Sequence, residues 1–288
     1  MSERVPVSKT HKLFIGGAFP RSESGRSYPV VGWDGSTVAW AAQGSRKDAR
    51  DAVKAARGAF AGWSGATAYN RGQVLYRVAE IVEGRSAQFV DALAVVGAPD
   101  PIAEVGLAID RLVYYAGWTD KISVVAGSAN SVAGPYFNFT VPEPTGVVAI
   151  CAPETPGLVG IVSLLAPALA AGNSTVVVVP EGAALVGVAL AEALATSDVP
   201  GGAVNLLTGF TAELAPVLAG HGDVDAIDLT GVADAAIESE CERLAAGDIK
   251  RVVRALGPEP EWFTAAAQHA QAVTATMELK TVWHPRAP

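Results

Sequence analysis

The chain has 288 residues, with 21 Lys and Arg against 29 Asp and Glu, so its net charge is 21 − 29 = −8. Half of the residues are hydrophobic and only 17% are charged, which excludes a largely disordered chain and leaves ample material for a buried core. The acidic balance argues against nucleic acid as a partner, because that binding depends on neutralising phosphates.

Three features of the sequence predict a cytoplasmic protein with no membrane partner. Two cysteines cannot build a disulfide framework and are typical of a reducing compartment. The first residues lack the apolar region of a signal peptide. The most apolar later run, Leu158 to Ala171, contains Pro167 and is shorter than the roughly 20 residues of a membrane span.

The first part of the chain predicts a short β entry followed by helices. Residues 12–42 combine brief apolar runs with Gly- and Ser-rich turns, which indicates short strands. Ser45 and Asp48 have the spacing of a capping box, so a helix should start there. Apolar residues at helical spacing predict a second helix from about Asn70 and a third over 102–118.

From Gly146 onward, apolar β-branched runs alternate with helical segments. Such alternation is typical of a parallel sheet covered by helices on both faces, so we expect a Rossmann-like, doubly wound α/β domain of about five strands. The predicted strands are Val147–Ala152, Thr175–Val179, Val204–Leu207, Ala226–Leu229 and Arg251–Leu256, and the helices between them are Leu158–Ala171, Ala184–Thr196, Ala212–Leu218 and Ala233–Ala246.

Two segments fall outside this alternation and predict a protruding β-ribbon. Residues 128–141 have the pattern of a hairpin around Gly134 and Pro135, and residues 276–284 form a further strand that is expected to pair with it. An isolated ribbon is barely stable and leaves open strand edges, so we infer that it docks on another surface. The apolar side chains expected at this interface are Phe137 and Phe139 on the hairpin and the alternating Met277, Leu279, Thr281 and Trp283 on the terminal strand.

A series of motifs resembles the NAD(P)-dependent aldehyde dehydrogenases. The resemblance implies that residues 1–127 and 142–272 form the family's cofactor domain, and that 128–141 with 273–288 form its oligomerisation ribbon. The chain is most similar to a degenerate, truncated member, like the second module of double-module aldehyde dehydrogenases. The motifs, in chain order, are KLFIGGAFPRSESGRSYPVV, DAVKAARGAFAGW, YYAGWTDK, VPEPTGVVAICAP, LLAPALAAGNSTVVVVP, GGAVNLLTG and DAIDLTG.

The family's catalytic groups have no counterparts at the matching positions. The resemblance implies a cysteine nucleophile on a separate catalytic domain and a glutamate base in an ELGG motif. Here Ala255 takes the place of the glutamate, and the 288 − 257 = 31 residues after Gly257 pass into the ribbon strand. Cys151 and Cys241 precede this point and have the surroundings of core residues. We therefore predict that the catalytic domain is absent and name no catalytic residue.

The resemblance also implies a cofactor site, of which only a remnant is expected. No lysine ends the second strand, whose last residue is Val179, and Val232 replaces a phosphate-binding serine. Four scattered histidines give no metal-binding pattern. We expect no cofactor, with NAD or NADP as the alternative. The residues that match the family's cofactor positions are Thr155, Glu181, Gly209 and Gly231, the two glycines being equally suited to tight turns.

Three functions remain open on this sequence. The leading hypothesis is a non-catalytic subunit that assembles, through its ribbon, with an active NAD(P)-dependent aldehyde dehydrogenase and stabilises or regulates it. The alternative is an NAD(P)-dependent oxidoreductase acting on aldehydes, alone or as a half-enzyme that contributes to a partner's active site. The third is a homo-oligomer that binds another small molecule in the cleft that, by the resemblance, would hold the nucleotide.

Overall fold

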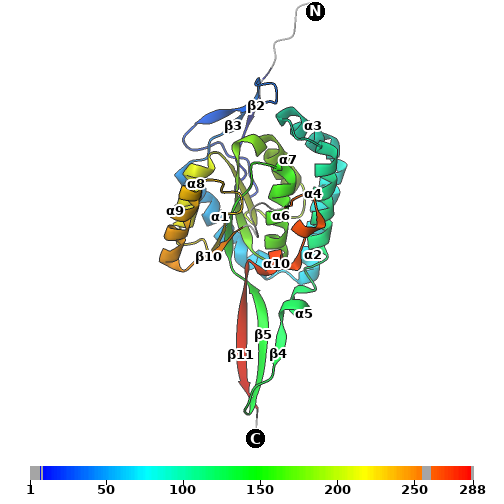
Figure 1. The fold of residues 1–288 in the computed structure, drawn as a ribbon, viewed down its shortest axis with the longest axis vertical. Coiled ribbons are helices and arrows are strands. Elements are labelled where there is room, and N and C mark those ends of the chain that lie inside the picture. The colour runs from blue at the N-terminus through cyan, green and yellow to red at the C-terminus, as the bar shows by residue number, and fades with distance from the viewer. Residues whose placement is uncertain (1–6, 8, 255–260, 287–288) are drawn as a thin grey trace, which may run out of the picture.

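The computed structural model describes residues 7, 9–254 and 261–286. At its centre lies a five-stranded parallel sheet with helices on both faces (Figure 1). The strand order is β10-β9-β6-β7-β8, so the chain moves outward in one direction from β6 and then returns to its other side with β9. The doubly wound architecture is confirmed, with strands β6 Val147–Cys151, β7 Ser174–Val179, β8 Val204–Thr208, β9 Ala226–Asp228 and β10 Arg251–Val253.

The helices form two layers because successive residues of the central strands point to opposite faces. Val147 and Ala149 of β6 pack with α1 and α8, whereas Val148 and Ile150 pack with α2, α4 and α6. The helices are α1 Arg46–Ser64, α2 Ala68–Gly84, α3 Ser86–Val96, α4 Pro101–Ala116, α5 Ile122–Ala126, α6 Gly157–Ala170, α7 Ala184–Ala195, α8 Thr211–Ala219, α9 Ala235–Ala245 and α10 Ala270–Thr274, with short 3-10 turns at Glu181–Ala183, Ala246–Asp248 and Ala265–Ala267.

The N-terminal region agrees with the predicted β entry and helices. A small sheet of β1 Thr10–His11, β2 Ser27–Val31 and β3 Thr37–Ala42 precedes α1. The capping box is confirmed, because Ser45 caps α1 and the Asp48 carboxylate accepts the Ser45 N–H at 2.8 Å. Helix α3 was not predicted: no side chain caps its start at Arg85, so the sequence holds no start signal there.

The predicted ribbon projects from one end of the body (Figure 1). It consists of β4 Ser128–Asn130, β5 Tyr136–Pro144 and β11 Met277–Pro285, in the order β11-β5-β4 with antiparallel pairing. Strand β5 extends to Pro144, beyond the predicted hairpin limit at residue 141. The last predicted sheet strand was Arg251–Leu256. Its residues 255 and 256 lie outside the described residues, and residue 255 is the Ala255 that takes the place of the family's base.

The register of the ribbon separates the six predicted interface residues. Leu279 lies opposite Pro142, and Trp283 lies opposite Asn138, whereas Phe139 lies opposite Val282. Since directly paired residues share a face and neighbours alternate, the two phenylalanines and the Leu279–Thr281–Trp283 row are on opposite faces. The predicted interface residues are therefore divided between the two faces of the ribbon. Met277 is 5% exposed and belongs to the core of the body.

The side chain of Asn173 joins the ribbon to the body. It is fully buried at the turn between α6 and β7. Its Oδ1 accepts the Gly146 N–H at the start of β6, and its Nδ2 donates to the carbonyls of Ala168 and Thr276. Residue 276 immediately precedes β11, so this amide fixes the point at which the terminal strand leaves the body.

We predict that Asn173→Ala lowers the free energy of unfolding by about 2–4 kcal/mol, because it leaves the buried Gly146 N–H without an acceptor and removes the side-chain hydrogen bonds to the Ala168 and Thr276 carbonyls. Urea denaturation of the purified chain measures the change. The matched control is Asn70→Ala on the exposed surface of α2, which should change the stability by less than about 0.5 kcal/mol. Equal stability of the two variants would contradict the role of Asn173.

Candidate functional site

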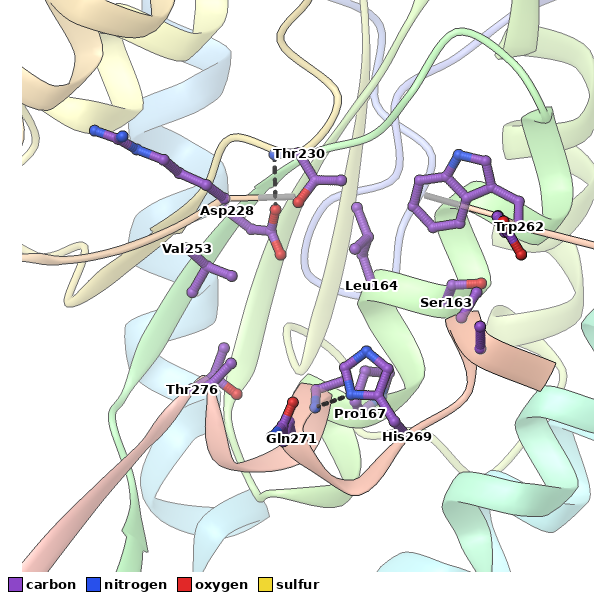
Figure 2. Close-up of a pocket in the computed structure, with 16 residues that line it drawn as sticks. Ser163, Leu164, Pro167, Asp228, Thr230, Val253, Trp262, His269, Gln271 and Thr276 are labelled. Carbon is purple, nitrogen blue, oxygen red and sulfur yellow. Dashed lines mark hydrogen bonds between the residues drawn. The ribbon is translucent and has the colours of Figure 1, made fainter. Parts of the chain in front are cut away.

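The candidate site lies at the carboxyl ends of β9 and β10. In open parallel sheets, ligands bind at the carboxyl edge where the strand order reverses, here between β6 and β9. A pocket of about 720 Å³ adjoins this point, between the strand ends, α6 and α10 (Figure 2). Its lining includes the labelled side chains of Ser163, Leu164, Pro167, Asp228, Thr230, Val253, Trp262, His269, Gln271 and Thr276.

Asp228, the last residue of β9, presents a buried carboxylate to this pocket. Its side chain is 6% exposed, and Oδ1 accepts the Thr230 N–H at 2.9 Å. Burial raises the pKa of this carboxyl to about 6, although the hydrogen bonds from Thr230 act in the opposite direction. The neighbouring Arg254 pairs with Glu242 and lies 3.8 Å from Glu238, both on α9. Within the part of the chain that the structure describes, no cation pairs with Asp228.

Arg111 on α4 holds the opposite wall of the pocket in place. Its guanidinium is 1% exposed and donates to the Ser163 hydroxyl and to the backbone carbonyl of Trp262. Burial lowers the pKa of this arginine. The Ser163 hydroxyl donates in turn to the Val159 carbonyl, so it is not available as a nucleophile. The contacts of Arg111 fix the segment around Trp262 against α4 and α6.

His269 contributes an oriented imidazole to the same pocket. Its Nδ1 accepts the Ala272 N–H at 3.2 Å, at the start of α10 (Figure 2). In the neutral ring the proton therefore sits on Nε2, which acts as a donor. The pocket thus combines one buried carboxylate, one imidazole donor, threonine hydroxyls and apolar walls.

The structure brings the four predicted cofactor residues to one edge of the sheet. Thr155 follows β6, Glu181 follows β7, Gly209 follows β8 and Gly231 follows β9. Both glycines are required by packing. Gly209 has φ +148°, and a Cβ there would lie 3.0 Å from the backbone nitrogen of Gly44. A Cβ at Gly231 would overlap the backbone at the end of β6.

The backbone donors at this edge already have partners within the chain. After β9, the Gly231 N–H donates to the Cys151 carbonyl at 3.0 Å. After β7, the Gly182 N–H donates to the Glu154 carboxylate at 2.6 Å. Burial, followed by the nearby Glu181, raises the pKa of Glu154, and the Gly182 hydrogen bond lowers it. At the start of α9, the Asp234 carboxylate accepts the Ala236 N–H at 2.8 Å.

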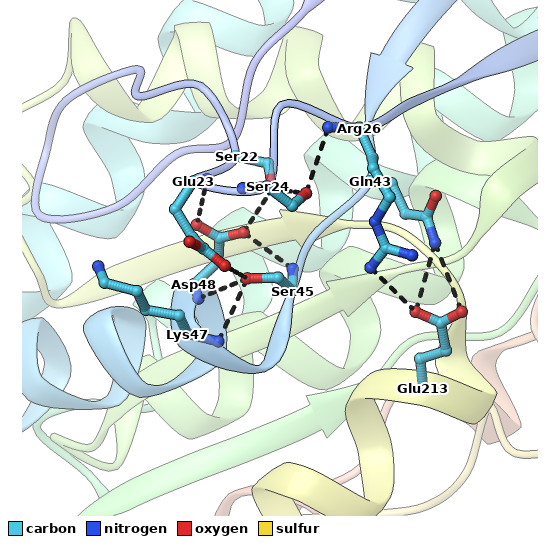
Figure 3. Close-up of polar contacts among 9 residues, drawn as sticks. All are labelled: Ser22, Glu23, Ser24, Arg26, Gln43, Ser45, Lys47, Asp48 and Glu213. Atoms are coloured by element: carbon cyan, nitrogen blue, oxygen red, sulfur yellow. Dashed lines mark hydrogen bonds and ion pairs between the residues drawn. The ribbon is translucent and has the colours of Figure 1, made fainter.

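The same arrangement occurs at the start of α1 (Figure 3). Asp48 accepts from the Ser22 hydroxyl and the Ser45 N–H, and the Ser45 hydroxyl donates to Glu23 at 3.0 Å. Phosphate groups bind at helix N-termini through free N–H groups and the positive end of the helix dipole. Carboxylates of the chain itself take that position here, so this edge is poorly suited to a pyrophosphate.

Neither cysteine is placed for nucleophilic attack. Cys151 and Cys241 are both fully buried. Burial raises the pKa of the Cys151 thiol strongly, and it raises the pKa of Cys241 to about 11. Both thiols are therefore protonated near neutral pH and shielded from a substrate.

Two other kinds of feature are absent from the described residues. Residues 7, 9–254 and 261–286 contain no group of three His, Cys, Asp or Glu side chains arranged to hold a metal ion. In the same residues, no helix has both the length and the apolar character needed to cross a membrane.

Sequence reasoning missed the residues that build the pocket. Asp228, Arg111, Trp262 and His269 were not identified. For Asp228 a signal existed, since an acidic residue interrupts the predicted buried strand Ala226–Leu229. No comparable signal marks Arg111 and Trp262, because their contact joins segments that are 151 residues apart.

A helical N-terminal part, a five-stranded parallel sheet and a projecting ribbon together define a doubly wound α/β protein with an appended ribbon. The sequence model of the aldehyde dehydrogenase family matches residues 21–282. The chain therefore belongs to the aldehyde dehydrogenase family.

Individual relatives agree with this assignment. The mitochondrial aldehyde dehydrogenase of Rattus norvegicus is 31% identical over 86% of this chain and 48% of its own length. A putative aldehyde dehydrogenase of Bacillus subtilis is 33% identical over 86% of this chain and 50% of its own. The chain spans about half the length of the curated relatives it matches.

Solved structures show the same relation. A putative aldehyde dehydrogenase from Burkholderia cenocepacia is similar with a TM-score of 0.79 and 32% identity, over 85% of this chain and 52% of its own. The NAD+ complex of an aldehyde dehydrogenase from Bacillus cereus gives a TM-score of 0.77 and 26% identity, over 85% and 50%.

We predict that Asp228→Asn stabilises the folded chain at pH 8 by about 1–3 kcal/mol, because the wild-type carboxyl has a folded-state pKa of about 6 against an ordinary 3.8. The unfolded chain releases this proton first as the pH rises, so wild-type stability falls between about pH 4 and pH 6. The gain from the variant should be small at pH 4 and complete above pH 7.

Chemical denaturation across this pH range measures the difference. The control is Asp91→Asn on the exposed surface of α3, which makes the same chemical change and should give no pH-dependent gain. If Asp228→Asn is less stable than the wild type at pH 8, the carboxylate makes a favourable interaction that the described contacts do not contain.

Proposed function

We propose that this chain is a non-catalytic aldehyde dehydrogenase-like subunit. It assembles through its β-ribbon with an active NAD(P)-dependent aldehyde dehydrogenase chain and stabilises or regulates that chain. The observation that carries the proposal is the free edge of β11, a nine-residue strand at the side of a projecting ribbon, in a chain whose two thiols are buried.

The lack of an accessible thiolate supports the non-catalytic part of the proposal. Acyl transfer by a cysteine needs a deprotonated and exposed sulfur. Both cysteines are in the core, and Cys241 has a pKa of about 11. Only 276 − 257 = 19 residues lie between Gly257, at the end of the last sheet strand predicted, and Met277 of the ribbon. A further domain has no room in that interval.

The exposed side chains of the ribbon support the assembly part. Trp283 is 58% exposed and Leu279 is 60% exposed on one face, while Phe137 is 43% exposed on the other. Trp283 and Tyr136 stack edge to face with ring centroids 5.7 Å apart, which holds the indole in a fixed orientation. A fixed aromatic side chain beside a free strand edge suits strand addition to a partner's sheet.

The double variant Leu279→Lys with Trp283→Lys tests the assembly. Co-expressed with a tagged full-length aldehyde dehydrogenase from the same organism, the wild-type chain should co-purify, and the variant should lose at least about 90% of the recovered complex, since buried charges at an interface are costly.

The matched control is Ile102→Lys with Trp33→Lys, which changes two exposed apolar side chains of the body, outside the ribbon strands, and should leave recovery unchanged. Phe137→Lys identifies the contribution of the opposite face. Failure of the wild-type chain to co-purify with any full-length relative, or equal recovery of the two double variants, would contradict the proposal.

Calorimetric titration with NAD and NADP distinguishes this function from that of an oxidoreductase or half-enzyme. We predict no binding tighter than about 100 μM, which corresponds to roughly 5.5 kcal/mol, because carboxylates already occupy the helix N-termini at the sheet edge. A full-length relative that binds NAD serves as the positive control. Binding at micromolar concentration would favour the half-enzyme.

The oligomeric state of the chain alone separates hetero-assembly from self-assembly. Light scattering should show a monomer if the ribbon requires a different chain. A stable dimer or tetramer that the Leu279→Lys and Trp283→Lys changes dissociate would instead indicate a homo-oligomer.

A further inference from the structure

The pocket at the end of β9 contains a negative charge for which the chain supplies no partner. Asp228 is 6% exposed, and its hydrogen-bond neighbour is Thr230, a neutral residue. Arg254 lines the pocket but pairs with Glu242 of α9. Residues 255–260 read ALGPEP and include no cationic side chain. An ionised carboxylate is costly to bury without a counter-ion, so this position favours a cation from outside the chain.

The walls of the pocket are suited to an organic cation. Apolar groups from α6 and α10 line the same pocket as the carboxylate, among them Leu164, Pro167 and Ala272. Across from Asp228, the Trp262 side chain forms part of the wall (Figure 2). Indole faces attract cations, and a volume of about 720 Å³ lies in the usual range of small-molecule sites. The Thr230 hydroxyl is a further acceptor for an ammonium group.

The pocket is also a fixed part of the structure. The Arg111 guanidinium holds the Trp262 carbonyl, and the Nδ1 atom of His269 caps α10. On the opposite side, β9 pairs with β6 and β10 in the sheet. The groups that face the carboxylate are therefore positioned before any ligand arrives, which reduces the entropic cost of binding.

We propose that this pocket binds a small organic cation, namely a protonated primary amine with an apolar body. The ammonium group pairs with Asp228, and the apolar body packs on the α6 and α10 walls beside Trp262. This binding is independent of the ribbon-mediated assembly, and no covalent step is involved.

Titration with benzylamine, monitored by isothermal calorimetry at pH 8, tests the proposal. The wild-type chain should bind benzylamine with a dissociation constant of about 1 mM or tighter, and benzyl alcohol, the neutral analogue, at least ~10-fold more weakly. Asp228→Asn should weaken benzylamine binding at least ~10-fold, whereas the surface control Asp91→Asn should leave it unchanged. Thermal melting confirms that each variant is folded.

A second variant and a second pH give independent checks. Ala266→Leu adds a side chain to the pocket wall and should weaken binding while Asp228 is retained. At pH 5 the affinity should fall, because Asp228 is then mostly protonated. The other titratable groups of the pocket are Glu261, Arg254 and His269. His269→Gln retains Asp228 and should therefore keep the pH dependence.

The outcomes that overturn the proposal are specific. They are no benzylamine binding to the wild type at ~10 mM, equal affinity for benzylamine and benzyl alcohol, or wild-type affinity in Asp228→Asn. Wild-type affinity in Ala266→Leu would place the ligand outside this pocket and would overturn the proposal as well.

Discussion

The buried amide of Asn173 is the constraint on which the arrangement of the two parts depends. It connects the start of β6, the end of α6 and the residue before β11 through hydrogen bonds that water does not reach. An aspartate or alanine would leave donors or acceptors unpaired in the core, so few residues are suited to this position. Because of this contact, the terminal strand of the ribbon is anchored to the sheet domain at the point where it begins.

At the carboxyl edge of the sheet, tight glycine turns occur together with carboxylates that accept from the backbone donors there. The glycine turns after β8 and β9 are retained because side chains there would collide with the backbone of neighbouring segments. The donors that a phosphate would use are bound instead to Glu154 and Asp234. Self-supplied carboxylates satisfy the helix ends as an anion would, and they repel a second anion.

The architecture could be predicted from the sequence because it depends on patterns among residues that are close together in the chain. Buried strands alternate with helices along the chain, and the capping box at Ser45 involves a residue only three positions away. The ribbon was predicted from its alternation, yet the relative faces of Phe139 and Trp283 depend on a register between distant strands. The pocket was missed for the same reason: its wall is held by a contact between residues 111 and 262, which no local pattern encodes.

The position of β11 in the chain has a consequence for biosynthesis. Strand β5 ends at Pro144 and its partner begins at Met277, so 277 − 144 = 133 positions separate the two on the ribosome. Throughout that interval the long edge of β5 has no partner from its own chain, and unpaired edges are where nascent chains aggregate or are captured. Under the proposed assembly, the early presence of a partner strand would cover this edge, and the abundance of the partner would set the yield of folded protein.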